Sequence, residues 1–472
     1  MVKPEHRELA ESLFADTSVL ICSDGCRHLG GVLGTPEYCQ DYVRTKVTVW
    51  SQEVKKLAEY ALSQPQAAYA AFTQGLRHKW SFVARTVPCT SDLFIPLEHA
   101  IRHSLIPALT GRAAPGDQER AILALPCRAG GLGLIDPSSL SCQFDSSVTI
   151  TRPLVHKILQ QDHPMDGVSS SVAAAKKMVA ASSREVDQDR ASSLLLECDS
   201  HSQRTLQLAS EKGASSWLTC RPLRQFGFSL PKGTFRDALC LRYGWTPPRL
   251  PSSCVCGKPF DSTHALSCPT VGYTAIRHNA IRDLTASLLQ EVATDVSVEP
   301  PLQPLSGERL HLRSAIREDG ARLDVAASGV WGSRFERTFY DIRVFNPHVR
   351  SNRSSSSSLA SVYTKHEQEK RRSYEERVRE VEHGTFLPLV FSTTGGCGKA
   401  ASTFFKRLGH MLADKRKEPF STTMAWLRTL ISFALVRSCG MSLRGHRVPP
   451  GHSDPVETAS PSVLAVSDCH IR

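Results

Sequence analysis

The sequence lacks any long apolar run. No stretch of eighteen or more uncharged apolar residues occurs, and the opening MVKPEHRELAESL is charged and has no signal-peptide core. These two absences argue against a membrane-bound or secreted protein, so we expect a soluble, non-secreted chain. The sequence also shows no internal repeat.

The fifteen cysteines do not form the dense framework of a small disulfide-bonded domain. They are scattered over 472 residues, with one tight cluster. This distribution suits a reducing compartment and one metal site better than a set of disulfides. The chain is long enough for roughly two to four domains, and its 41% hydrophobic content can supply ordinary buried cores.

Negative charge is in the minority. Lysine and arginine number 57 against 46 aspartate and glutamate residues, a net charge of +11. A basic balance favours a polyanionic partner such as nucleic acid, although many basic proteins bind none. Charge alone therefore leaves the partner open.

The first half of the sequence has helical patterning. Apolar residues recur at helical spacing over residues 37–64, until Pro65 ends the pattern. Further helices are predicted at 67–86 and 96–109, before glycines and a proline interrupt the pattern at 128–137. Residues 141–225 are rich in Ser, Ala and Gln and predict a polar helical connector.

The second half alternates predicted helices and strands. A change of character near residue 230 suggests a domain boundary, with a short amphipathic helix, a proline-rich break and then the cysteine cluster. Helices are expected at 277–292, 364–384 and 401–416, and strands at 322–328, 338–345 and 386–394. This order predicts a compact α/β core, and the chain as a whole is predicted to be α+β. Residues 351–358 are predicted to be a low-complexity loop.

Four candidate zinc ligands lie within fifteen residues. Cys254 and Cys256 can sit on one turn, which Gly257 permits, and His264 and Cys268 are one helical turn apart. Zinc requires four such ligands in a tetrahedron, so we expect a closed, structural site. The alternative is a set of buried thiols beside a chance histidine.

A second cysteine group is weaker. Cys22, Cys26 and His28 lie close together, but no convincing fourth ligand is near. We expect these to be ordinary side chains rather than a metal site.

A glycine-rich segment, FSTTGGCGKAAS, resembles a phosphate-binding loop only in part. Ala400 follows Gly398 and Lys399, and no glycine stands at position 393, so the required form is not met. A tight turn between a strand and a helix is the better interpretation.

Two aspartates lie in apolar strands. Asp324 and Asp341 are separated by a segment short enough for a hairpin, so their carboxylates can lie on adjacent strands. Magnesium accepts one or two protein carboxylates and keeps several waters, and phosphodiester hydrolysis at neutral pH requires such an ion. A lone strand aspartate is more often turn-facing or salt-bridged, so this second interpretation stays open.

Arg343 stands where a metal-dependent nuclease would place a lysine. A cation from a neighbouring helix can reach the same position, and Lys370 and Tyr374, four residues apart, share one face of the helix at 364–384. The alternative is a solvated helix with internal ion pairs. The cations that this helix offers are Lys365, Lys370, Arg371 and Arg372.

The order of these motifs resembles a known family. The Cys-Cys-His-Cys group, RHN at 277–279, Asp324, the D-x-R strand and the helix with Lys370 are similar to the C-terminal halves of non-LTR retrotransposon polyproteins. These carry a zinc knuckle followed by a restriction-like endonuclease of the PD-(D/E)XK class. The sequence departs from the family in having Leu323 before Asp324 and a short gap between its first two cysteines.

The resemblance implies roles for these residues. It implies that Asp324 and Asp341 hold Mg, that Lys370 is a catalytic lysine relocated from the strand, and that Arg343 and Tyr374 support phosphate binding. It also implies that the knuckle positions nucleic acid together with a basic set, since basic residues supply most of the energy of phosphate contacts. That set is Arg277, His278, Asn279, Arg371 and Arg372.

The front of the chain resembles the end of a reverse transcriptase. CRHLGGVLGT, with Leu29 and Gly30, is similar to a primer grip, and the helices to about residue 112 are similar to a thumb. FADT at 14–17 is superficially similar to the polymerase metal-binding box, but Thr17 replaces its second aspartate. The resemblance therefore implies a truncated element or domesticated fragment without polymerase activity of its own.

The resemblance also implies an activity and its setting. We expect nicking of target DNA for target-primed reverse transcription, in the nucleus, with structural Zn, catalytic Mg, a DNA target and possible element RNA. The alternative is an inactive nucleic-acid-binding remnant, while a helical scaffold would explain only the front. The expected segments are 1–120, the reverse transcriptase remnant; 121–230, a helical linker; 231–276, a linker helix and CCHC zinc knuckle; 277–445, a restriction-like endonuclease with an α/β core; and 446–472, a disordered tail.

Overall fold

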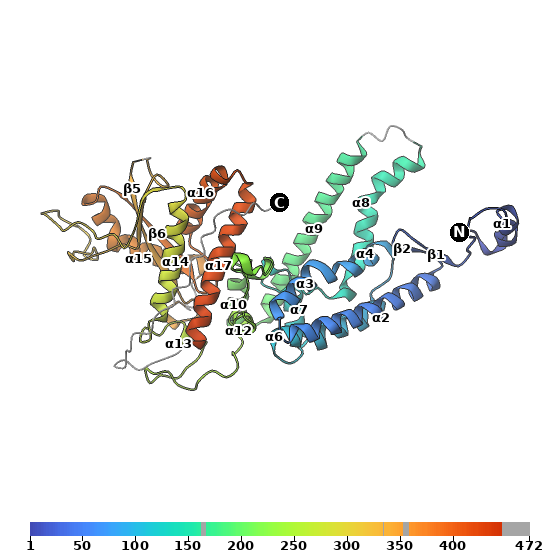
Figure 1. The fold of residues 1–472 in the computed structure, drawn as a ribbon, viewed down its shortest axis with the longest axis horizontal. Helices are drawn as coiled ribbons and strands as arrows, with labels where there is room; N and C mark the ends of the chain where they lie inside the picture. The colour runs from blue at the N-terminus through green and yellow to red at the C-terminus, as the bar shows by residue number, and fades with distance from the viewer. Residues whose placement is uncertain (162–166, 334, 353–357, 446–472) are drawn as a thin grey trace. The chain divides into compact units, whose positions relative to one another are not determined.

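The protein has an α+β fold in two compact units, Met1–Gln203 and Arg204–Arg472 (Figure 1). We describe a computed structural model, which covers residues 1–161, 167–333, 335–352 and 358–445. The predicted tail at 446–472 and most of the serine-rich loop lie outside the described residues. Within the described part of the chain, no helix is long and apolar enough to cross a membrane.

The N-terminal unit is almost entirely helical, with one small hairpin of β1 and β2. Short π-helical turns join α3 to α4 and α5 to α6. Its elements are α1 (Arg7–Leu13), β1 (Gly25–His28), β2 (Gly31–Gly34), α2 (Pro36–Ala61), α3 (Pro65–Ala71), α4 (His78–Thr86), α5 (Ile95–Ala100), α6 (Ile106–Thr110), α7 (Asp117–Ala124), α8 (Cys142–Leu159) and α9 (Val168–Glu197).

Helix α2 organises this unit. Thr35 caps its first turn by accepting a hydrogen bond from the Tyr38 N–H, and Pro36 occupies the first helical position, where no N–H is needed. Its buried stripe includes Val47 and Trp50, and the Trp50 ring lies 6.1 Å from that of Trp80 on α4. The apolar residues that recur at helical spacing in the sequence are thus buried on one side of α2, as expected for an amphipathic helix.

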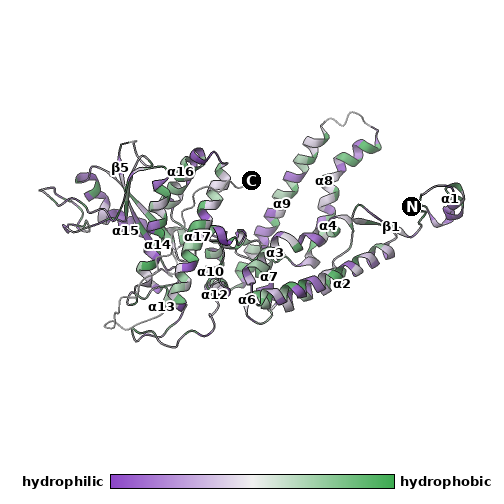
Figure 2. Cartoon of the chain, viewed as in Figure 1, coloured by the Kyte–Doolittle hydropathy of each residue, from purple (hydrophilic) through white to green (hydrophobic). Residues whose placement is uncertain are grey.

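Helices α8 and α9 pack side by side but bury little. Their hydrophobic and hydrophilic residues are mixed along their length (Figure 2), and α9 buries only Val168 and Leu194 over its thirty residues. This polarity agrees with the polar helical character expected of the segment.

The C-terminal unit contains helices and a four-stranded sheet. Its elements are α10 (Ser200–Ser210), α11 (Ser216–Thr219), α12 (Lys232–Tyr243), α13 (Ser262–Ala265), α14 (Tyr273–Gln290), β3 (Thr294–Val298), β4 (Val325–Ser328), β5 (Arg337–Phe345), α15 (Leu359–Glu380), β6 (Thr385–Ser392), α16 (Lys399–Arg416) and α17 (Phe420–Arg444).

The division between the units falls before residue 230, where the sequence suggested a boundary. Helix α11 packs against α17, and the backbone N–H of the buried Trp217 donates a hydrogen bond to Ser432 Oγ at 3.3 Å. Trp217 also meets Phe235 of α12 edge to face. Burial of this tryptophan ties residues 204–230 to the C-terminal unit.

The sheet has the order β3-β4-β5-β6, with β5 and β6 parallel and the other pairs antiparallel. Helix α15 makes the crossover between β5 and β6, which a parallel pair requires. Alternate residues of β5 face opposite sides, so Tyr340 and Ile342 join one core with α14, α16 and α17, while Phe339 joins a second with Val378 of α15. Asp341, two residues from Phe339, therefore lies on the α15 side.

The sequence did not predict β3 or α17, nor the long connection from β3 to β4. That connection is held against α15 by Arg377, which is fully buried and donates hydrogen bonds to the carbonyls of Gln303, Ile316 and Glu318. The two terminal nitrogens of this guanidinium thus bind three backbone carbonyls of the connection, as the several donors of an arginine allow. These bonds hold the connection against α15.

Candidate functional site

Asp324 and Asp341 lie side by side at the centre of the sheet. The antiparallel register pairs Val325 with Tyr340, so Asp324, one residue before β4, stands beside Asp341 on β5. Directly opposed residues of an antiparallel pair project from the same face, so the two carboxylates do not diverge. Their side chains are 15% and 7% exposed, respectively.

Lys370 reaches this pair from α15. Its Nζ lies 2.8 Å from Asp341 Oδ2, and its side chain is 23% exposed. Apart from this ion pair, Asp341 Oδ2 accepts no hydrogen bond from the described residues. The cation beside Asp341 is therefore Lys370 of α15, whereas Arg343 of the strand pairs with Glu369 instead.

Burial changes the protonation of Asp341. Removal from water raises its pKa to about 6, and the Asp324 carboxylate adds to this, while Lys370 and His278 act in the opposite direction. The two carboxyls thus lie together, with Lys370 against Asp341 and His278 against Asp324. Such a pair is a suitable anchor for a cation.

His278, at the start of α14, completes the site. Its Nε2 lies 3.1 Å from Asp324 Oδ2 and 3.0 Å from the Ile342 carbonyl oxygen. Both neighbours are acceptors, so we assign the proton to Nε2. Burial alone would lower the pKa of His278, but Asp324 and, further off, Asp341 outweigh it and raise the pKa.

Asp324 is fixed from two sides. Its Oδ2 accepts hydrogen bonds from the Ile342 backbone N–H, at 2.5 Å, and from His278. Because Ile342 follows Asp341 directly, this contact locks the two aspartates in register. Sequence reasoning placed His278 among nucleic-acid contacts and missed this role, for which its spacing from Asp324 gave no signal.

Arg343 and Tyr374 line the edge of the site. Arg343 donates to Glu369 Oε2 at 3.0 Å and is 36% exposed. Tyr374 stacks on Phe386, and the Lys370 ammonium lies 5.6 Å from the centre of its ring. Burial and the two aspartates raise the pKa of Tyr374 to about 12, so its hydroxyl stays protonated.

Arg277 does not lie where the sequence placed it. It is 2% exposed, and its guanidinium donates to the Leu266 carbonyl at 2.7 Å and to Ser442 Oγ at 3.3 Å. A buried side chain with these partners supports the fold and cannot meet a phosphate, which contradicts the predicted nucleic-acid contact. The residue binds α14 to the segment between His264 and Cys268.

The other predicted nucleic-acid residues differ in exposure. Asn279 contacts His278 through its side chain at 3.2 Å. Arg371 is half-buried and pairs with Glu375 at 2.5 Å, whereas Arg372 is exposed and, among the described residues, its side chain donates only to the Gln368 carbonyl of its own helix. Of the predicted basic set, Arg372 is the residue whose position leaves its charge available to a ligand.

The four predicted zinc ligands converge. The ligand atoms of Cys254, Cys256, His264 and Cys268 all lie within 4.8 Å of one another. The sulfurs of Cys254 and Cys268 are 3.9 Å apart, while a tetrahedral zinc at about 2.3 Å from each sulfur sets them about 3.8 Å apart. This cluster can hold a metal such as zinc.

Local chemistry builds this cluster. Gly257 has φ +81°, and its N–H donates to the Cys254 carbonyl, which closes the turn between the first two ligands. Asp261 caps α13 by accepting from the His264 N–H, and the Cys268 N–H donates to the His264 carbonyl. Among the described residues no other cysteine-containing group converges in this way, and Cys22, Cys26 and His28 do not.

The two sites share a support. Asn346, just beyond β5, donates from Nδ2 to the Thr263 carbonyl at 3.1 Å and to Ser267 Oγ at 2.9 Å. Arg277 makes a second link, because it binds Leu266 and stands next to His278. The cysteine cluster is therefore joined to both the strand that carries Asp341 and the helix that carries His278.

The glycine-rich segment forms the turn from β6 to α16, as the sequence predicts. Gly398 is the N-cap residue of α16, and it has no side chain with which to cap the helix.

No protein-family model matches the chain, and a comparison with curated proteins gives no match. Function must therefore be argued from the geometry of the sites.

Proposed function

We propose that the C-terminal unit is a magnesium-dependent DNA endonuclease of the restriction-like class found in non-LTR retrotransposon polyproteins. The observation that carries the proposal is the convergence of Asp324, Asp341 and Lys370, from the start of one strand, the middle of the next and a crossover helix. A structural ion-pair network also brings such groups together, so the cleavage experiment below decides between the two.

The donor set fits a hard divalent cation. Two carboxylates on one face of a sheet are enough for magnesium, which keeps the rest of its shell as water. When bound, the ion supplies a Lewis acid for the phosphate and lowers the pKa of its water. Asp324 and Asp341 hold it, and His278 and the Ile342 N–H keep Asp324 oriented.

Lys370 adds positive charge beside the phosphate. It pairs with Asp341 in a half-buried site, and in the proposed reaction it would stabilise the charge that develops on the phosphate oxygens. Arg343 can join it only by leaving Glu369. Tyr374, protonated at neutral pH, supports the lysine through its ring.

The proposal extends to the rest of the chain. The Cys/His cluster is a closed zinc knuckle that supports the nuclease core, and the target is DNA nicked to prime reverse transcription in the nucleus, with element RNA as a partner. The helical N-terminal unit is the remnant of a reverse transcriptase thumb. These statements rest on the family resemblance together with the two sites.

Plasmid nicking tests the proposal. The intact chain with Mg²⁺ is expected to convert supercoiled plasmid to open circles, and Asp341→Ala to abolish this. Asp295→Asn is the matched control, because Asp295 is an exposed carboxylate of the same sheet and asparagine tolerates its positive φ. Plasmid binding without nicking by the intact chain would support the inactive remnant, and nicking that survives Asp341→Ala would reject the assignment.

A further inference from the structure

Three side chains beside the acidic site form a cluster of their own. Arg343 lies two residues beyond Asp341 on β5, so the two project from the same face, about 7 Å apart along the strand. The Arg343 guanidinium donates to Glu369 Oε2 of α15 at 3.0 Å, and the same oxygen lies 3.5 Å from Nδ1 of His366. One carboxylate thus lies between an arginine of the strand and a histidine of the helix.

His366 is buried without a hydrogen bond. It is 4% exposed, its ring packs on Phe345 with the centroids 4.5 Å apart, and neither ring nitrogen has a hydrogen-bond partner among the described residues. Its distance to Glu369 is longer than the roughly 2.7–3.2 Å of a hydrogen bond. Burial and Arg343 lower the pKa of His366, so the neutral ring carries one N–H. This ring would gain a hydrogen bond if the carboxylate moved slightly closer.

The Arg343–Glu369 ion pair is open to solvent. Its side chains are 36% and 37% exposed, respectively. Among the described residues, the Arg343 guanidinium has no other hydrogen-bond partner. An ion pair at this exposure is weak, whereas an arginine binds a phosphate through two parallel hydrogen bonds. A phosphate that approaches Arg343 can therefore displace the carboxylate.

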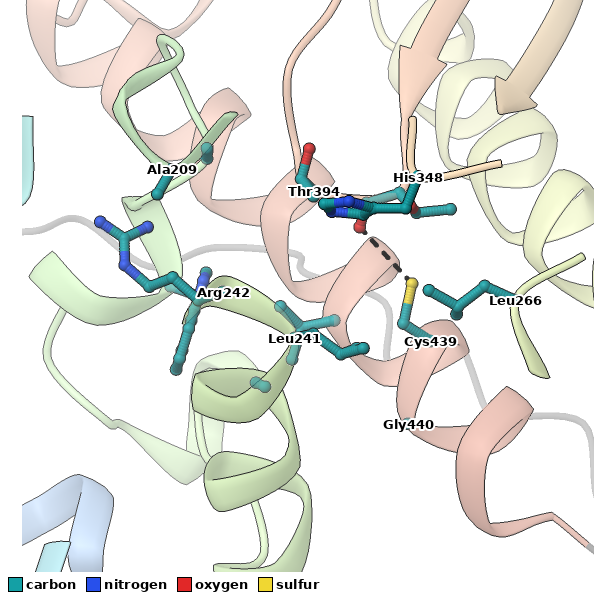
Figure 3. Close-up of a pocket in the computed structure, with 13 residues that line it drawn as sticks. Ala209, Leu241, Arg242, Leu266, His348, Thr394, Cys439 and Gly440 are labelled. Atoms are coloured by element: carbon teal, nitrogen blue, oxygen red, sulfur yellow. Dashed lines mark hydrogen bonds between the residues drawn. The ribbon is translucent and has the colours of Figure 1, made fainter. Parts of the chain in front are cut away.

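A cavity elsewhere in the unit does not contact this cluster. It has a volume of about 50 Å³ and lies between Leu241, Leu266 and Cys439 (Figure 3). The Cys439 thiol donates there to the Thr393 carbonyl. None of its lining residues belongs to β5 or α15, so we interpret it as a gap in packing.

We propose that a phosphate of the bound DNA displaces Glu369 from Arg343, and that His366 then holds the released carboxylate through its Nδ1–H. This inference rests on the proposed function, which places the DNA backbone over Asp324 and Asp341. In the free protein Glu369 neutralises Arg343 and competes with phosphate for it. In the complex Arg343 binds the phosphate, and the carboxylate turns toward the histidine. Glu369 and His366 are thus positioning residues.

A purely structural ion pair gives the opposite expectation. If Glu369 only kept Arg343 in a useful orientation, loss of its charge would weaken DNA binding. If Glu369 competes with phosphate, loss of its charge strengthens DNA binding. The sign of the change in affinity therefore distinguishes the two roles.

Binding of a labelled DNA duplex to the intact chain measures this sign, with Ca²⁺, which also takes carboxylate ligands, in place of Mg²⁺. Glu369→Gln is expected to bind about three- to tenfold more tightly than wild type. Glu380→Gln is the matched control, because it removes the same charge from an exposed ion pair with Arg379 on the same helix, and it should leave the affinity nearly unchanged. Binding by Glu369→Gln that is no tighter than binding by Glu380→Gln would overturn the proposal.

Variants of the two partners test the exchange itself. Arg343→Met should weaken binding, reduce the salt slope by about 0.9, the value for one phosphate contact, and remove the gain given by Glu369→Gln. His366→Phe keeps the ring on Phe345 but removes its N–H, so we expect binding about threefold weaker in the wild type and unchanged in the Glu369→Gln background. Equal losses from His366→Phe in both backgrounds would contradict the exchange.

These measurements do not require cleavage. Nicking by the wild type, together with no gain in affinity in Glu369→Gln, would reject the exchange and keep the endonuclease assignment. A gain in affinity in Glu369→Gln, in a chain that does not nick, would keep the exchange and reject the endonuclease. A chain that binds no duplex would contradict both.

Discussion

The two candidate sites of the C-terminal unit are built in opposite ways. The Cys/His cluster takes all its ligands from one segment, residues 254–268, and its geometry follows from one glycine turn and one capped helical turn. The acidic site takes its residues from α14, the start of β4, the middle of β5 and α15, and exists only after the sheet has formed.

The difference decides what each site depends on. A site made from adjacent residues is lost when a ligand is lost and depends little on its surroundings. A site made from distant elements is sensitive to register, since a one-residue slip between β4 and β5 would move one aspartate to the other face.

Loss of a cluster ligand should have the largest effect. We expect Cys268→Ser to abolish bound zinc and to destabilise the C-terminal unit, because binding in structural zinc sites is worth about 10 kcal/mol or more. Metal analysis of the purified chain measures this. Cys142→Ser, at an exposed cysteine, should keep its zinc. Zinc content unaffected by Cys268→Ser would rule out the ligand set.

Within the acidic site, Lys370 should matter through its position. Lys370→Met is expected to lower the nicking rate about 10²- to 10³-fold, the usual cost of one stabilising contact to a developing charge. Lys365→Met removes an exposed lysine from the same helix and should leave the rate nearly unchanged. Similar rates for the two variants would show that Lys370 is only part of a structural ion pair.

Glu211 provides a buried carboxyl outside both sites. Its pKa is 4.5 ordinarily and about 7 in the folded chain, so the folded state holds the proton more tightly and wild-type stability falls as pH rises through this interval. Glu211→Gln should therefore gain stability relative to wild type between pH 4 and pH 8, by roughly 3 kcal/mol. Urea unfolding at both pH values measures this, and a difference independent of pH would contradict the raised pKa.

Substitutions of Arg277 and Arg372 should have different effects, the first on stability and the second on DNA binding. Arg277→Met leaves the Leu266 carbonyl without its donor, which should cost about 2 kcal/mol of unfolding free energy. Arg372→Met should leave stability unchanged and weaken DNA binding with a smaller salt dependence. Urea unfolding and DNA titration at two salt concentrations measure these effects. The reverse pattern would restore Arg277 to the nucleic-acid interface.

The link between the sites should give the smallest effect. Asn346→Ala removes the hydrogen bonds from β5 to Thr263 and Ser267 but touches no proposed ligand. We expect zinc content to be unchanged and nicking to fall about tenfold, since each lost bond is worth about 1 kcal/mol. Loss of zinc in this variant would mean that the cluster depends on the sheet, against the contrast drawn above.

Sequence patterns predicted what local chemistry decides. The spacing of Cys254, Cys256, His264 and Cys268 was enough to find the cluster, and the apolar alternation of β5 placed Asp341 on a strand. The helical period of α2 was equally clear. In each case the residues that set the structure are neighbours in the chain.

Patterns failed where distant segments meet. Helix α17 is apolar on most of its surface because α14, α16 and α11 surround it, so it has little amphipathic signal. His278 contacts Asp324 through the packing of α14 on the sheet, and burial of Arg277 follows from the same packing. Charge and helix position alone could not distinguish a buried arginine from an exposed one.

The central claim is that Asp324 and Asp341 together hold one divalent ion. The most direct test uses crystals of the intact chain. They are soaked in Mn²⁺, and the anomalous scattering of the ion is measured. We predict one peak at about 2.0–2.3 Å from an oxygen of each aspartate, absent in Asp341→Asn. No peak, with Asp341 still paired to Lys370 and Asp324 to His278, would show that the four residues form a structural ion-pair network and not a metal site.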